Sequence, residues 1–263
     1  MGWQRTTLGA TKIEVCRLGL AAGYGAPAET VERAFEHGVN YFYWGSLRRT
    51  AFAEGLRRLA PNRERFLLVI QSYSRTARLV GWSLERALRA LRFDQADVLL
   101  LGLWNRRPPE RILEAAQRLK ERGLVRFLAL STHHRPLVPT LAAEGIFDIF
   151  HVRYNAVNPG AERDVFPRLP QGDRRPGIVT FTATRWGQLL GHRRIPENEK
   201  TPTATDCYRF VLSHPAVDVC LAGPGSAHEF EAALEALRRG PMSEDEQSWM
   251  RRVGRAISGK PEA

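Results

Sequence analysis

The most chemically distinctive stretch of the sequence is GVNYFYWGSLRR, which spans residues 38–49. A short β-prone run breaks there into Gly45 and then two arginines, so a strand ends and a polar loop begins. Tyr43 brings a phenol that can donate a proton, and the guanidinium of Arg48 could assist it or bind an anionic group through two hydrogen bonds. The alternative is that the tyrosines at positions 41 and 43 only fill a core.

Other aromatic residues also follow predicted strand ends, where chains that alternate strand and helix place their chemistry. Tyr73 stands two residues past Gln71, so an extended chain would put both on one face. The sequence thus predicts a pocket for a flat small molecule that is apolar or anionic, with Tyr43 or His133 as its acid. Each ring could instead pack beneath a loop. The predicted pocket residues are Trp44, Tyr73, Trp104 and His133.

The chain that must position these residues alternates strand-like and helix-like runs. Residues 3–15 read as a hairpin that would plug one end of a round structure. Eight strand-helix units follow at intervals of roughly 30 residues, which favours parallel pairing and is the number that closes a barrel. We therefore predict an α/β fold in one domain over residues 1–263, a (β/α)8 TIM barrel with an N-terminal β-hairpin and an extra C-terminal helix. The predicted strands are 16–23, 39–44, 66–71, 97–101, 125–131, 146–152, 178–182 and 217–221. The predicted helices are 29–36, 52–59, 79–91 and 243–257, with others beginning near residues 109, 136, 160, 203 and 227.

Two interior segments are predicted to be long loops. One is QGDRRPG at residues 171–177, and the other spans residues 191–205 and is rich in proline and charge. Because long loops on the active face of a barrel often act as lids, we expect these two to border the site.

Composition narrows the classes of function. The 263 residues carry a net charge of +11, but the arginines are scattered along predicted helix faces, which makes nucleic acid an improbable partner. The predominance of arginine over lysine has two explanations: genomic base composition, or an anionic ligand that the guanidinium group suits. No apolar run approaches a membrane span, and we expect a cytoplasmic protein. The three cysteines have no ligand spacing, so we expect buried thiols and no metal site.

Five segments taken in order resemble the aldo-keto reductases over nearly the whole chain. They are GVNYF, ADVLLL, LKERGLVRFLALS, FDIFHVRYNAVNPGAERDVFP and RFVLSHPAVDVCLAGPGS. The resemblance implies an eight-stranded α/β barrel that binds NADP(H) at the carboxyl ends of its strands. It also implies the reduction of aldehydes and ketones by hydride transfer.

The catalytic positions implied by this resemblance are all changed. Tyr43 stands where the family has an aspartate, and Arg48 stands where it has the proton-donating tyrosine. Gln71 replaces a lysine, and Gly102 replaces a histidine. Because an arginine cannot release a proton near neutral pH, the family's own proton transfer is lost, and we expect a rebuilt site of Tyr43, Arg48 and Gln71.

The cofactor positions implied by the resemblance are better preserved. Ser131 and Thr132 fall where the family holds the nicotinamide carboxamide, although asparagine is usual at the second. His151 replaces a carboxamide-binding glutamine, and Phe181 falls where a ring stacks on the nicotinamide. After the eighth strand, a helix start could hold phosphate through its N–H groups. Its residues are Gly223, Gly225 and Ser226.

Three readings remain open. The first is an atypical NADP(H)-dependent oxidoreductase of a small-molecule substrate, in which Tyr43 is the acid and Arg48 assists it. The second is a non-catalytic protein that binds a nucleotide or small anion and regulates a partner. The third is an enzyme that has abandoned the nicotinamide. The fold decides among none of them, and the surviving cofactor positions favour the first.

Overall fold

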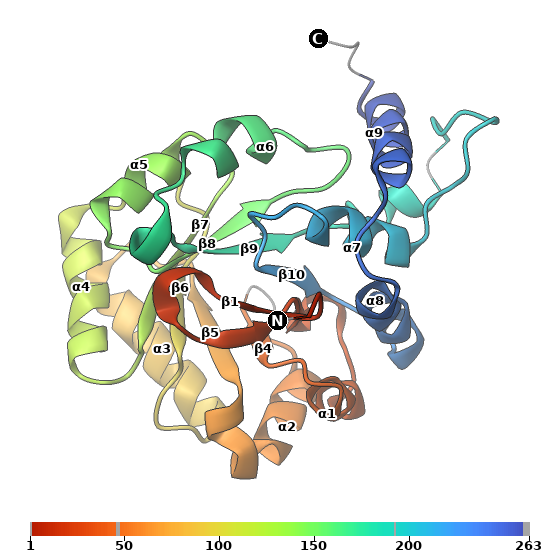
Figure 1. Cartoon of the computed structure of the whole chain (residues 1–263). Coiled ribbons are helices and arrows are strands. Elements are labelled where there is room, and N and C mark those ends of the chain that lie inside the picture. The colour runs from red at the N-terminus through yellow and green to blue at the C-terminus, as the bar shows by residue number, and fades with distance from the viewer. Residues whose placement is uncertain (1, 46–47, 192, 260–263) are drawn as a thin grey trace.

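Eight parallel strands close into a barrel in the computed structural model, which describes residues 2–45, 48–191 and 193–259. The order around the barrel is β10-β3-β4-β5-β6-β7-β8-β9, so neighbours in sequence are neighbours in space (Figure 1). The predicted (β/α)8 fold is confirmed. The barrel strands are β3 (Leu18–Ala21), β4 (Tyr41–Trp44), β5 (Leu67–Ser72), β6 (Val98–Leu101), β7 (Phe127–Thr132), β8 (Ile149–Arg153), β9 (Gly177–Phe181) and β10 (Val219–Ala222).

Helices connect the strands and form the outer layer (Figure 1). The sequence sets several of their starts: Thr203 and Ser243 each close a capping box, with Asp206 and Glu246, at α7 and α9. The helices are α1 (Ala28–Glu36), α2 (Thr50–Arg58), α3 (Ala77–Leu91), α4 (Glu110–Glu121), α5 (Leu137–Glu144), α6 (Ala161–Asp164), α7 (Ala204–Leu212), α8 (Ala227–Arg239) and α9 (Glu244–Ser258). Short 3-10 turns are η1 (Gly9–Thr11), η2 (Ala22–Tyr24), η3 (Ala60–Arg65), η4 (Phe166–Arg168), η5 (Gly172–Arg174) and η6 (Gln188–Leu190).

Side chains alternate between two hydrophobic cores along each barrel strand, as extended chains require. On β4, Tyr41 belongs to the cluster inside the barrel and Tyr43 packs against it. Phe42 and Trp44 belong to the larger cluster between the barrel wall and the helices. This alternation decides which residues near a strand end can reach the barrel mouth.

The N-terminal hairpin closes the end of the barrel opposite the carboxyl ends of the strands. Its strands β1 (Arg5–Thr7) and β2 (Glu14–Cys16) pair antiparallel, and Leu8 between them is fully buried in the interior cluster. Burying such a side chain contributes about 1.5–3 kcal/mol. The N–H of Ala10 donates to the carbonyl of Arg175 at 2.7 Å. The loop at residues 171–177 therefore leads into the amino end of β9 beside the hairpin, and our expectation that it borders the site is wrong.

The second long loop follows β9 and lies on the side of the barrel where the strands end. The indole N–H of Trp249 on α9 donates to the carbonyl of Lys200 at 3.1 Å, and Arg252 on α9 pairs with Glu199. This loop is therefore held against α9.

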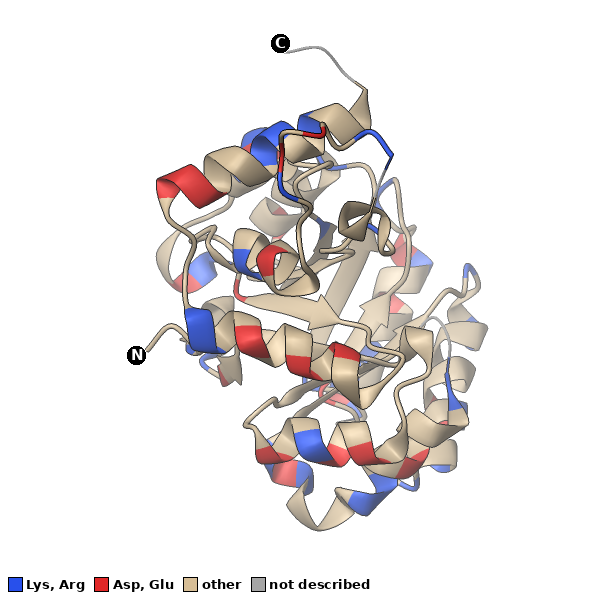
Figure 2. Cartoon of the chain, turned by 90° about the vertical axis from the view of Figure 1, so that its right-hand side faces the viewer, with Lys and Arg blue, Asp and Glu red and all other residues tan. Residues whose placement is uncertain are grey.

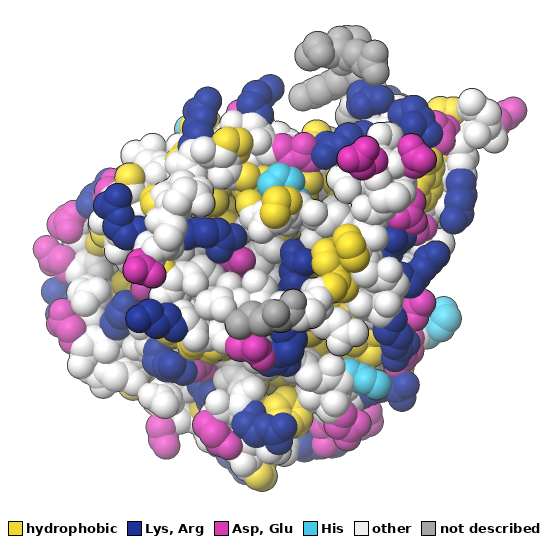
Figure 3. All heavy atoms as spheres, in the orientation of Figure 1, with side chains coloured by type: hydrophobic (Ala, Val, Ile, Leu, Met, Phe, Trp, Pro, Cys, Tyr) yellow, Lys and Arg dark blue, Asp and Glu magenta, His cyan; other side chains and the backbone are white. Residues whose placement is uncertain are grey.

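Charges of both signs are distributed over the outer helices (Figure 2) and are interspersed on the face in Figure 3. Many arginines pair with carboxylates; Arg209, for example, is buried and holds Glu246 through two hydrogen bonds of 2.6 and 2.8 Å. The three cysteines are buried and free, as expected. Among the described residues, no helix has both the length and the apolar character needed to cross a membrane.

Gly9 should be sensitive to substitution because its φ is +48° and a Cβ there would lie 2.6 Å from the carbonyl oxygen of Arg175. Gly9→Ala is expected to lower the free energy of unfolding by about 1–3 kcal/mol, measured by urea denaturation. Gly23→Ala is the control, since a Cβ at Gly23 meets nothing within 4 Å. Equal stability of the two variants would contradict a tightly seated hairpin.

Candidate functional site

A phenol and an amide meet at the carboxyl ends of β4 and β5. The Tyr43 hydroxyl donates a hydrogen bond to Oε1 of Gln71. Two glycines make room for the pair: a Cβ at Gly45 would overlap the Tyr43 ring, and one at Gly102 would overlap Nε2 of Gln71. Positions 43, 71 and 102 therefore form one fitted group, in which the Gln71 amide fills the space that a side chain at position 102 would take.

A buried histidine lies beneath this pair. The Tyr41 hydroxyl and Nε2 of His151 are 2.8 Å apart, and the His151 ring lies 5.8 Å from the Tyr43 ring, centroid to centroid. Burial lowers the pKa of His151 to about 3, so the ring is neutral at physiological pH. Burial, and then the neighbouring Tyr43, raise the pKa of Tyr41. His151 is 2% exposed, and its Nε2 faces the Tyr41 hydroxyl. Its contact with a nicotinamide carboxamide stays a prediction.

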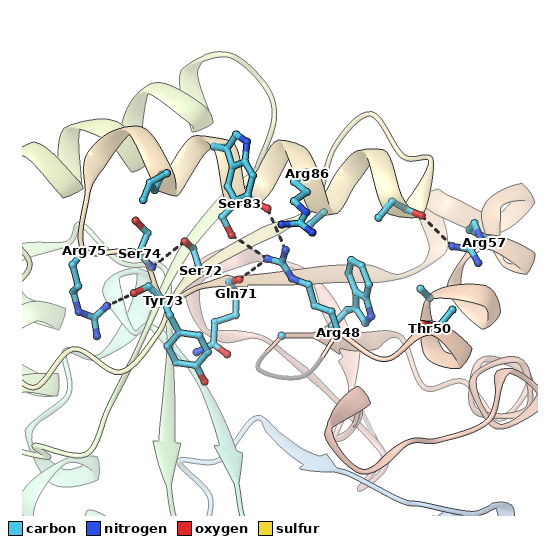
Figure 4. A pocket seen from close by; sticks show the side chains of 17 residues that line it. Arg48, Thr50, Arg57, Gln71, Ser72, Tyr73, Ser74, Arg75, Ser83 and Arg86 are labelled. Atoms are coloured by element: carbon cyan, nitrogen blue, oxygen red, sulfur yellow. Dashed lines mark hydrogen bonds between the residues drawn. The ribbon is translucent and has the colours of Figure 1, made fainter.

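Arg48 turns outward from the barrel toward α3 (Figure 4). Its Nη2 donates to the carbonyl of Gln71 at 2.8 Å and to Oγ of Ser83 at 3.2 Å, and its guanidinium lies 5.5 Å from the Trp44 ring centre. Burial and then the charge of Arg86 lower the pKa of Arg48, whereas Tyr43 raises it. Arg48 thus acts on Tyr43 through its field, while its hydrogen bonds hold it against the helix.

The predicted aromatic pocket is divided between two faces. Trp44 and Trp104 are 4% exposed and belong to the layer between strands and helices, so they do not line the barrel mouth. For Trp44 the cause is the alternation along β4. Tyr73 is 48% exposed, and a Cβ at Gly102 would lie 2.8 Å from its Cδ1. Since Gln71 also borders Gly102, Tyr73 shares the face of Gln71 as predicted.

The predicted cofactor residues at the end of β7 brace the loops that follow β6 and β7. Ser131 Oγ accepts from the N–H of Leu103 at 2.9 Å, and Thr132 Oγ1 accepts from the N–H of His134 at 2.9 Å. The rings of His133 and Phe181 lie 6.2 Å apart at an angle of 31°. Phe181 and His133 thus come together at the ends of β9 and β7, the two strands on either side of β8.

A cationic group at the ends of β8 and β9 escaped the sequence analysis. Burial lowers the pKa of Arg153, and the charges of Arg135 and Arg185 lower it further, so both of these cations lie near Arg153. Arg135 pairs with Asp164 at 2.8 Å. Within the described part of the chain, the side chains of Arg153 and Arg185 have no hydrogen-bond or ion-pair partner. Arg153 lies two residues beyond His151 on the same strand, and this spacing is the signal that could have identified it.

The start of α8 is occupied by a side chain of the helix itself. The N–H of Gly225 donates to Oε2 of Glu229 at 2.7 Å, and Ser226 Oγ accepts from the N–H of Glu229 at 3.2 Å. We expected free N–H groups for phosphate at Gly223, Gly225 and Ser226. Instead a phosphate would have to displace the Glu229 carboxylate from Gly225.

The fold has close matches among solved structures. The aldo-keto reductase AKR11C1 from Bacillus halodurans, in its holo form, superposes with a TM-score of 0.78 at 18% identity over 96% of both chains. An aldo/keto reductase from Klebsiella pneumoniae in complex with NADP and acetate gives 0.76 at 19% identity over 95% of both chains. The chain has the aldo-keto reductase fold. No protein-family model and no curated protein matches it.

The neutral His151 makes stability depend on pH. Because its folded-state pKa lies below the ordinary value of 6.5, the unfolded chain takes up the proton first. Its contribution is therefore complete above pH 6.5 and is lost as the pH falls toward 3, at up to about 1.4 kcal/mol per pH unit. His151→Gln should flatten this slope in urea unfolding between about pH 6.5 and pH 4.5. The exposed His228→Gln variant is the control; identical slopes for both variants would argue against a neutral His151.

Proposed function

We propose that the chain is an NADP(H)-binding oxidoreductase of aldo-keto reductase type, with Tyr43 as the proton donor of a rebuilt site. The observation that carries this proposal is the pair of Tyr43 and Gln71 at the barrel mouth, where Gly45 and Gly102 leave room for both side chains. A merely structural remnant would not require both glycines beside a hydrogen-bonded phenol.

NADP(H) is the cofactor that the mouth of the barrel fits best. Arg153 and Arg185 offer guanidinium groups without carboxylate partners in the described chain, and such groups suit the pyrophosphate. Phe181 would stack on the nicotinamide, and the Ser131 hydroxyl would hold its carboxamide. When bound, the cofactor supplies the hydride. The neighbour from Klebsiella pneumoniae was solved with NADP, which supports the same assignment.

In this proposal Tyr43 gives its hydroxyl proton to the oxygen of a carbonyl substrate. Before the substrate binds, Gln71 holds the phenol by accepting its hydrogen bond and adds no charge. The hydroxyl then turns from Gln71 to the substrate oxygen, to which it gives the same proton. The field of Arg48 favours the phenolate that remains, since the interaction that raises the pKa of Arg48 acts on both partners. The neutral side chains of Tyr43 and Gln71, with Gly45 and Gly102 beside them, thus stand in place of the aspartate and lysine that the family resemblance implies.

One observation favours non-catalytic binding of a nucleotide or small anion as a second candidate function. Gln71 and Gly102 bring neither a cation nor a second acid to Tyr43, whereas the arginines near Arg153 would still attract a nucleotide. Under this candidate the protein binds NADPH but reduces no carbonyl compound, and Tyr43→Phe changes nothing.

Tyr43→Phe should lower kcat by about 10²–10⁴-fold, because the proton donor is lost. The variant's Kd for NADPH should be unchanged. The measurements are an NADPH titration by nicotinamide fluorescence and a turnover screen of aromatic and acidic carbonyl compounds. Tyr73→Phe is the control, since Tyr73 is exposed. Equal turnover by wild type and Tyr43→Phe would exclude Tyr43 as the acid. Failure of NADPH to bind would exclude it as the cofactor.

Glu229→Gln should tighten NADPH binding relative to NADH by about 3- to 10-fold. The substitution removes a carboxylate from the start of α8, where the family resemblance places the adenosine phosphate, and weakens its hold on the Gly225 N–H. Glu235→Gln makes the same charge change farther along α8 and is the control. If both variants change the ratio of the Kd values for NADPH and NADH equally, the phosphate does not approach Glu229. Fluorescence titrations give both constants.

A further inference from the structure

A groove of about 760 Å³ lies between α2 and α3, outside the barrel mouth. Figure 4 looks into it and shows Arg48 reaching from the loop after β4 toward Ser83 on α3, with Arg86 close by. Four arginines line the groove, and no aspartate or glutamate does so in the described part of the chain. Its volume lies within the range of small-molecule sites, roughly 300–1,000 Å³.

Two of the four arginines are already satisfied. Arg57 pairs with Glu54 at 2.6 Å. Arg75 donates to the carbonyls of Gly102 and Leu103 at 3.1 and 2.8 Å and lies over the ring of Trp104. Neither has a guanidinium free to bind a ligand.

The other two arginines face each other without an acid. Within the described part of the chain, the Arg48 side chain donates only to neutral oxygens, on Gln71 and Ser83. The Arg86 guanidinium lies 5.2 Å from the Trp82 ring centre, and it has no hydrogen bond or ion pair among the described residues. The charge of Arg86 also lowers the pKa of Arg48, so the two cations repel each other. An anion between them would remove this repulsion.

The wall beside these cations is flat and apolar. Trp82 is 49% exposed and Leu79 is 48% exposed, and both line the groove. Exposing two large apolar side chains side by side is unfavourable unless a ligand covers them. Trp82 offers a ring face to a planar group, and Arg86 lies over the same indole.

We propose that this groove binds a small organic anion. A carboxylate or phosphate group lies between Arg48 and Arg86, and a planar ring packs on Trp82 and Leu79. The proposal is separate from the oxidoreductase function, although Arg48 serves in both: the groove lies between α2 and α3, and of the pair at the barrel mouth only Gln71 lines it. Phosphate and carboxylate share the chemistry that guanidinium groups recognise, and the probes below distinguish them.

The test measures, by titration calorimetry, the binding of phenyl phosphate, benzoate and inorganic phosphate to the full chain. At least one aromatic anion should bind more tightly than inorganic phosphate does. Whichever of phenyl phosphate and benzoate has the lower Kd carries the preferred anionic group. Binding of neither at about 10 mM, or equal binding of inorganic phosphate, would overturn the proposal.

Arg86→Gln should weaken binding of the preferred probe by about 10- to 100-fold, as expected for a charged hydrogen bond. Arg86 is exposed and unpaired in the described structure, so the variant should fold normally. Arg78→Gln is the matched control, since Arg78 is exposed on the same helix and does not line the groove. Arg153→Gln should also leave the probe's affinity unchanged. Equal weakening by Arg78→Gln, or loss of binding in Arg153→Gln, would place the anion elsewhere and overturn the proposal.

Discussion

The buried contact between Tyr41 and His151 sets the character of the barrel interior. A polar group that leaves water must find a partner, and the tyrosine hydroxyl and the imidazole satisfy each other at 2.8 Å. Because the imidazole remains neutral, the interior holds no charge at this level. The Tyr43 ring packs beside the same imidazole, and its hydroxyl bonds Gln71 at the barrel mouth. Its partner Gln71 completes a site that depends on shape and hydrogen bonding rather than on an ion pair.

This neutrality explains where the arginines lie. Burying an unpaired cation beside a neutral amide would cost several kcal/mol, so the guanidinium of Arg48 turns outward, where carbonyl and hydroxyl oxygens accept its hydrogen bonds. Arg153 likewise ends β8 at the rim, only partly buried. The positive charge thus surrounds the site without entering it. Such a rim attracts anions to the mouth.

The fold could be predicted because it depends on a repeated local pattern. The periodicity of each strand-helix unit predicts it locally, and a turn at Leu8 to Ala10 predicts the hairpin. Side-chain direction was predictable only along a strand: Tyr43 and Gln71 follow from alternation, as does the outward position of Trp44. The direction of Arg48 was not, because it depends on Ser83, 35 residues away. The hydrogen bond from the Gly225 N–H to the Glu229 carboxylate was not predictable either. The sequence allows this cap at the start of α8 but does not require it.

The position of residues 171–177 follows from a topological rule that composition alone does not reveal. In a parallel barrel, a loop that leads into a strand lies at the opposite end from a loop that leaves one. Residues 171–177 enter β9, and their contact with the hairpin at Ala10 is the consequence. Residues 182–190 leave β9 beside Arg153, and the left-handed backbone at Thr182, Arg185 and Trp186 bends this segment sharply. Three such residues in one short segment cost energy that packing elsewhere must offset. A strained segment that carries Arg185 to the rim is what a site for an anionic ligand would require.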